Sequence, residues 1–147
     1  MKKLILSLAM LTATIAFAQK KEIANAVKAV DSGDLTTANS ELSKAEGMFG
    51  EKTYLLEPSV LEQYYYAKGL SLLKSGKSTE GAEYLAKINT LGSEDIYSGK
   101  DADKNKVYFV GKESADKFGN GISLKQEKYA PSLTEKLRQS IDPLLRK

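Results

Sequence analysis

Apolar residues recur at every third or fourth position in four segments of the chain, a period that places them on one face of a helix. The segments span residues 20–32, 35–46, 59–75 and 78–92. Gly33 and Gly76 each separate two of these segments, and glycine suits the left-handed residue that ends a helix. Asp34 and Ser78 are placed to cap the helices that follow, and Pro58 suits the first turn of the third. Because short turns make neighbouring helices antiparallel, the pattern predicts two helical hairpins.

The two predicted hairpins share a set of positions at a constant separation. Four positions of the first recur 43 residues later in the second, and the pairs are Gly33 with Gly76, Ala38 with Gly81, Leu42 with Leu85, and Ala45 with Ile88. Four coincident offsets indicate an internal repeat. We expect the same positions to pack the two helices of each hairpin together, with residues 47–57 as a connection between hairpins.

The second hairpin resembles a tetratricopeptide repeat. The first helix of that family carries a large aromatic residue, a small residue and a large apolar residue, which here are Tyr65, Gly69 and Leu72. A glycine then ends the helix, and the second helix has small, bulky and small residues; the matching positions are Gly76, Gly81, Leu85 and Ile88. The chain departs from the family at Lys68, where Leu is usual, and at Ile88, where Ala is usual.

The resemblance implies an all-α fold of antiparallel helical hairpins stacked as a short α-solenoid. Such repeats are scaffolds that bind protein or peptide partners, so it also implies binding rather than catalysis. In these stacks the first helices line the concave surface, and the residues placed there by resemblance are Tyr66, Leu70, Leu73 and Lys74. The alternative is that Tyr66 and Leu70 belong to the core and are covered by the rest of the chain.

The second half of the chain has weaker patterns. Residues 93–106 are rich in Asp, Lys, Gly and Ser and predict a loop. The segments 107–110 and 122–124 have strand-like residues and suit a small hairpin, whereas 112–118 suits one or two helical turns equally well. We therefore expect residues 93–130 to form an irregular insertion before a last helix that starts at Pro131 or Ser132.

A candidate calcium loop lies within this insertion. Asp101, Asp103 and Asn105 alternate as at the start of a calcium-binding loop. Lys106 then stands where the sharp turn needs glycine, and Lys112 where the bidentate glutamate belongs. We expect a solvated loop and neither a metal site nor a cofactor.

Composition narrows the classes of function. The 147 residues suit one domain. The net charge is +3, and the lysines alternate with acidic residues and do not form a basic run, so we expect no nucleic-acid partner. Cysteine and histidine are both absent, which excludes thiol nucleophiles, Cys/His metal sites and the usual general base. A glycosidase needs a pair of carboxylates, and four glutamates near the hairpins are candidates for such a pair. Glutamates on helix surfaces are normally solvated, however, so we expect no enzyme. The four glutamates are Glu57, Glu62, Glu80 and Glu83.

Residues 1–18 have the form of a secretory signal peptide. Lys2 and Lys3 precede an apolar run, and Ala16 and Ala18 occupy the positions that a signal peptidase reads, so cleavage should leave Gln19 first. The alternative is an N-terminal membrane anchor. We expect an exported chain, periplasmic or associated with the outer envelope, with no stable membrane span after cleavage. It would not be a lipoprotein, because no cysteine follows the apolar run.

These expectations divide the chain into a signal peptide (1–18), two helical hairpins (19–92), an insertion (93–130) and the start of a further helical unit (131–147). We expect a non-catalytic helical-repeat scaffold that binds a protein or peptide in a Gram-negative cell envelope. The resemblance also suggests an N-terminal fragment of a longer protein. Two alternatives remain: a purely structural part of a larger repeat protein, or an accessory domain of an envelope enzyme.

Overall fold

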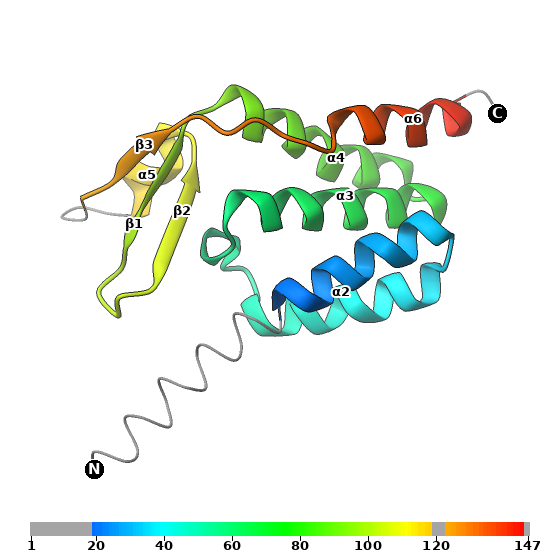
Figure 1. Cartoon of the computed structure of the whole chain (residues 1–147), viewed down its shortest axis with the longest axis horizontal. Coiled ribbons are helices and arrows are strands. Elements are labelled where there is room, and N and C mark those ends of the chain that lie inside the picture. Colours follow the sequence, from blue (N-terminus) through cyan, green and yellow to red (C-terminus); the bar gives the residue numbers. More distant parts are fainter. Residues whose placement is uncertain (1–18, 119–122, 146–147) are drawn as a thin grey trace, which may run out of the picture.

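A computed structural model describes residues 19–118 and 123–145, with side chains placed as far as residue 140. The predicted signal peptide lies outside the described residues. The fold is mostly helical and carries a small three-stranded antiparallel sheet at one end (Figure 1). The elements are a helix of residues 19–32, α2 (Leu35–Phe49), the 3-10 turn η1 (Thr53–Leu55), α3 (Pro58–Lys74), α4 (Ser78–Ser93), β1 (Ile96–Lys100), β2 (Lys106–Val110), α5 (Lys112–Phe118), β3 (Lys125–Glu127) and α6 (Thr134–Leu145).

The four predicted helices form two antiparallel hairpins, which lie side by side in Figure 1. Gly33 and Gly76 make the turns with positive φ angles of 83° and 85°. The Asp34 side chain caps α2 by accepting from the Thr37 amide at 3.1 Å, and Thr37 holds the pKa of that carboxyl below its usual value. Ser78 does not cap α4: it is the first helical residue, and Lys77 precedes it without a side-chain cap bond. That these hairpins form a repeat solenoid stays a prediction.

The main core lies around α3, which is packed on both sides. The N-terminal helix and α2 cover one side, and α4 covers another. Repeat positions of both hairpins contribute to this core; the buried ones are Ala38, Leu42, Ala45, Tyr65, Gly69, Gly81, Leu85 and Ile88, while Leu72 is half-buried. Burial on two sides explains why α3 is apolar nearly all round.

The helices α3 and α4 pack closely at Gly69 and Gly81. A Cβ atom added to Gly69 would lie 2.4 Å from the Leu85 Cδ2 atom, and one added to Gly81 would lie 2.8 Å from the Gly69 carbonyl oxygen. Leu85 therefore occupies the space that a side chain at position 69 would need. This explains why glycine serves at both positions, although neither has a positive φ angle.

Residues 93–106 were expected to form a loop; this is wrong for residues 96–100, which form a strand, whereas residues 101–105 form a turn. β1 (Ile96–Lys100) is the central strand of the sheet and pairs with both β2 and β3, in the order β2-β1-β3. The register places Tyr97 opposite Phe109 and also opposite Gln126. Residues 107–110 were expected to pair with 122–124, but they pair with β1, and residue 122 lies outside the described residues. The helical alternative for residues 112–118 is correct, since they form α5.

The C-terminal segment runs back over the helices and places α6 beside α3 and α4 (Figure 1). The buried Glu62 carboxylate of α3 holds the residues just before α6. It accepts hydrogen bonds from the Ser132 and Leu133 amides at 3.2 Å and 3.0 Å. The Tyr129 hydroxyl also donates to it at 2.7 Å. Within the described ranges, none of the helices is both long and apolar enough to cross a membrane.

Candidate binding surface

The residues expected to line a concave binding surface do not form an open face. Tyr66 and Leu70 are 0% and 1% exposed, so both belong to the core, and this corrects the expected partner-binding assignment. Leu73 packs half-buried against the same core. The Lys74 ammonium donates at 3.1 Å to the Val30 carbonyl oxygen at the end of the N-terminal helix, where it neutralises that helix terminus.

Tyr66 is covered by polar groups from two distant segments of the chain. Its hydroxyl donates to the Asp31 carboxylate at 2.8 Å, and the Lys136 ammonium from α6 lies 5.3 Å from its ring centre. Lys136 also forms an ion pair with Asp31. Burial raises the pKa of Tyr66 to about 12. The second apolar side of α3 is therefore closed by the chain itself, as the alternative interpretation held.

A hollow lies at the sheet end of the molecule, between η1 and the sheet. It has a volume of about 1280 Å³, above the usual range for small-molecule sites. Four lysines line it, namely Lys52, Lys100, Lys106 and Lys125. Its other lining side chains include the rings of Tyr54, Tyr108 and Phe118. The surface is thus both cationic and aromatic.

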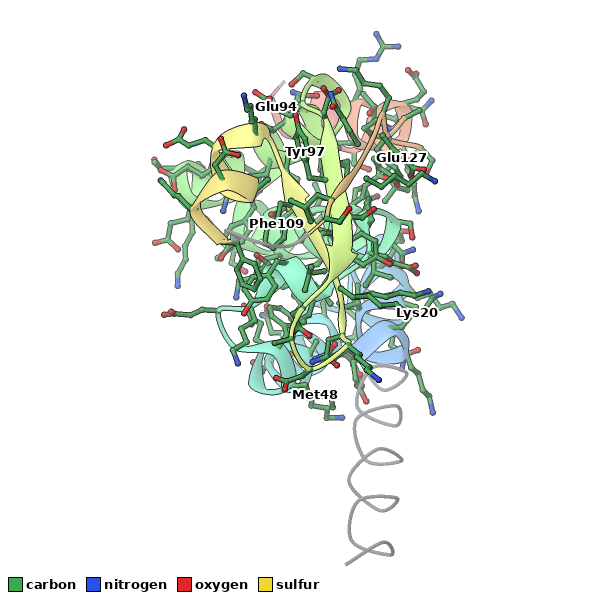
Figure 2. All side chains as sticks on the ribbon, turned by 90° about the vertical axis from the view of Figure 1, so that its left-hand side faces the viewer. Lys20, Met48, Glu94, Tyr97, Phe109 and Glu127 are labelled. Carbon is green, nitrogen blue, oxygen red and sulfur yellow. The ribbon has the colours of Figure 1, made fainter. Side chains whose placement is uncertain are left out.

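An aromatic cluster forms the wall of this hollow. The ring centres of Tyr54 and Phe118 are 4.8 Å apart, and Phe109 lies 5.7 Å from Tyr54 and 4.7 Å from Phe118. Phe109 is buried in a second small core with Val107 and Ala115, whereas Phe118 is 39% exposed. Figure 2 looks at this end of the molecule, with Phe109 and Tyr97 in the sheet region. The packed rings hold Tyr54 and Phe118 in place.

A second, smaller hollow of about 410 Å³ lies on the other side of the same wall. It shares Tyr54, Tyr108 and Phe118 with the first hollow. Its remaining lining is mainly apolar and includes Leu61, Tyr65, Phe109 and Val110. The two hollows therefore differ in degree: the first is lined by four lysines, and the second by one, Lys117, which pairs with Glu113, so its apolar lining suits an apolar side chain.

The candidate calcium loop is the turn between β1 and β2. The Asp101 carboxylate accepts from the backbone amides of Asp103 and Asn105 at 2.9 Å and 2.8 Å, so it closes its own turn. Lys104 completes the turn with a φ angle of 65°. Among residues 19–118 and 123–145, acidic side chains form no group of three that could hold a metal ion.

The four glutamates near the hairpins have separate surroundings. Glu62 is bonded to the segment that leads into α6, and Glu57 forms a 3.1 Å ion pair with Lys20. Glu80 and Glu83 are exposed on α4.

Sequence reasoning missed the residues of the lysine-lined hollow. Tyr54 and Lys52 lie in the connection of residues 47–57, and Phe118 lies in the insertion, both of which were treated as irregular. The available signal was the presence of aromatic residues in otherwise polar segments.

Comparisons with protein-family models, with curated proteins and with solved structures found no match to this chain.

Proposed function

We propose that this chain is an exported, non-catalytic helical scaffold that binds a protein or peptide partner in the cell envelope. The observation that carries the proposal is the lysine-lined hollow with its exposed aromatic wall. The helical hairpins supply a rigid support, because α3 and α4 pack closely where Leu85 lies against Gly69 and Gly81 lies against the α3 backbone. The resemblance to tetratricopeptide repeats supports binding by a scaffold, and the sequence features of residues 1–18 support export.

The proposed binding surface is the sheet end of the molecule and not the Tyr66 side of α3. Aromatic side chains are common anchors at protein interfaces, because a large rigid ring buries much area at a small entropic cost. Phe118 and Met48 are the two exposed large apolar residues among the described side chains, each 39% exposed. Phe118 belongs to the aromatic wall and lines both hollows, whereas Met48 lines neither hollow.

Photocrosslinking tests this proposal directly, with Met48 as a matched control. The photoreactive residue p-benzoylphenylalanine would replace Phe118 in one variant and Met48 in another, each expressed in the native host and irradiated in intact cells. We expect a discrete adduct from position 118 and none of that size from position 48. Equal adducts at both positions, or none at 118, would contradict the proposed surface.

A further inference from the structure

We propose that the partner is recognised through an acidic extended segment that carries a large apolar side chain. This inference rests on the proposed function and deepens it by naming the chemistry of the partner. The carboxylates of that segment would lie in the lysine-lined hollow, and its apolar side chain would enter the smaller hollow beyond the wall of Tyr54, Tyr108 and Phe118.

The placement of two lysines is the first observation that supports an anionic partner. Lys100 and Lys106 face each other directly across the β1–β2 pair. Like charges at directly opposite positions of a sheet repel and destabilise it. Among the described residues, neither lysine forms a salt bridge. A carboxylate bound between the two ammonium groups would turn this repulsion into attraction.

The rest of the hollow adds to the positive charge. Lys52 enters from the connection before η1 and also forms no salt bridge among the described side chains. Lys125 pairs with Glu127 of its own strand at 2.6 Å. Two acidic residues, Asp101 and Asp103, line the hollow as well, so its four lysines outnumber its carboxylates by two. The Asp101 carboxylate accepts from the backbone of its own turn. Charge complementarity therefore favours an acidic occupant.

The shape of the surface favours a polypeptide segment over a lipid surface. The cationic hollow is concave, and the apolar hollow lies beyond an aromatic wall. A flat anionic membrane would contact the rim of the cationic hollow but would not fill both hollows. An extended peptide can place alternating side chains on the two sides of the wall, because successive residues of a strand point in opposite directions.

Fluorescence anisotropy with a defined probe tests the inference. The probe is a fluorescein-labelled peptide of sequence Glu-Glu-Phe-Glu-Glu, compared with one in which serine replaces Phe and one in which lysine replaces each Glu. We expect the purified chain to bind the first peptide more tightly than the other two. Binding should weaken as NaCl rises from about 50 to 500 mM, because screening shortens the reach of the lysine charges.

Two double variants locate the binding. In Lys100→Glu with Lys106→Glu, the two facing residues still carry like charges, so the sheet keeps a similar repulsion while the hollow reverses its sign. We expect affinity for the acidic peptide to fall by about tenfold or more. The control is Lys21→Glu with Lys28→Glu, which makes the same net charge change on the exposed face of the N-terminal helix. It should alter affinity by less than about twofold.

Single variants keep the test valid if the double variant unfolds. Lys52 lies outside the sheet, and Lys52→Glu should weaken binding of the acidic peptide. Phe118→Ala should also weaken this binding, and by more than the control Met48→Ala. Equal binding of all three peptides, or equal effects of the paired variants, would overturn the inference. Binding to vesicles containing phosphatidylglycerol without binding to the peptide would overturn it in favour of a membrane surface.

The outcome for the proposed function can be separated from the outcome for this inference. If the crosslink at position 118 forms in cells and persists in the Lys100→Glu, Lys106→Glu variant, the scaffold function stands and the acidic partner is wrong. If the crosslink is absent and the peptide does not bind, both are wrong.

Discussion

Gly33 and Gly76 end successive helices with the same backbone geometry, 43 residues apart. The Gly33 amide donates to the Val30 carbonyl at 3.1 Å, and the Gly76 amide donates to the Leu73 carbonyl at 3.2 Å. The amides of the next residues, Asp34 and Lys77, donate to the Ala29 and Leu72 carbonyls at 2.8 Å and 2.9 Å. The two turns therefore repeat in space as well as in sequence. This pattern of two bonds around a left-handed residue is a Schellman motif, which satisfies carbonyl groups at the end of a helix.

Alanine at either turn should destabilise the fold by a similar amount. Both glycines have positive φ angles, and an added Cβ atom would meet nothing within 4 Å, so the cost comes from the backbone conformation alone. We expect Gly33→Ala and Gly76→Ala each to lower the free energy of unfolding by about 1–2 kcal/mol, measured by urea denaturation. Asparagine adopts this conformation more readily, so Gly33→Asn and Gly76→Asn should cost less. Alanine variants as stable as the wild type would contradict the turn geometry.

Gly69→Ala should destabilise the chain through a steric clash. The added methyl group would lie 2.4 Å from Leu85 Cδ2 and 3.1 Å from the Gly81 carbonyl oxygen, so the Leu85 side chain or the two helices would have to shift. We expect a loss of about 1–3 kcal/mol in the free energy of unfolding. Gly47→Ala in α2 is the matched control, because its Cβ atom would meet nothing within 4 Å and its φ angle is not positive. The control should be neutral or slightly stabilising, and equal losses in both variants would show that the approach of α3 to α4 is misplaced.

Glu62→Gln should loosen the attachment of α6. The Glu62 carboxylate accepts bonds from two amides beside the start of α6, whereas a glutamine side chain would turn an NH₂ group toward one of them. We expect hydrogen exchange in residues 134–145 to become faster and stability to fall by roughly 1–3 kcal/mol. Glu57→Gln is the control, since it alters only an exposed ion pair with Lys20 and should change stability by less than about 0.5 kcal/mol. Unchanged exchange in α6 would contradict the role of Glu62.

The chain should lose stability at high pH because of its buried tyrosines. Burial raises the pKa of Tyr65 and of Tyr66 to about 12, against about 10 in an unfolded chain. The neutral hydroxyls therefore stabilise the folded state fully below about pH 10, and this contribution is lost as pH rises to about 12. Urea unfolding should show constant stability from about pH 7 to 9 and a fall from about pH 10 to 12. Tyr66→Phe should have a shallower fall, and identical pH profiles for the two proteins would contradict the assignment.

The helical hairpins were predictable because local signals and long-range packing agree there. Apolar residues at helical spacing, Gly33, Gly76 and Pro58 each favoured the helix boundaries that the structure has. Leu85 and Ile88 share the apolar face of the predicted helix, and both are buried. In this part of the chain the sequence pattern alone was enough to identify the elements.

The sheet and the binding surface were harder to predict because they depend on contacts between distant residues. β1 contains Ser98, Gly99 and Lys100, which favour a loop, and it becomes a strand through pairing with β2 and β3. The Tyr66 side of α3 looked open because its cover comes from α6, about 70 residues later. Phe118 and Tyr54 lie on separate segments, so the contact between their rings could not be predicted from either segment alone.

Chemical-shift mapping with the Glu-Glu-Phe-Glu-Glu peptide tests most directly which surface binds a partner. The ¹⁵N-labelled chain would be titrated with the peptide, and the amide shifts followed by nuclear magnetic resonance. We predict the largest shifts in residues 52–54, 98–108 and 114–118, around the lysine-lined hollow. Shifts concentrated instead in residues 66–74 of α3 and in α6 would show that α6 moves aside to expose the Tyr66 side, and would contradict the account.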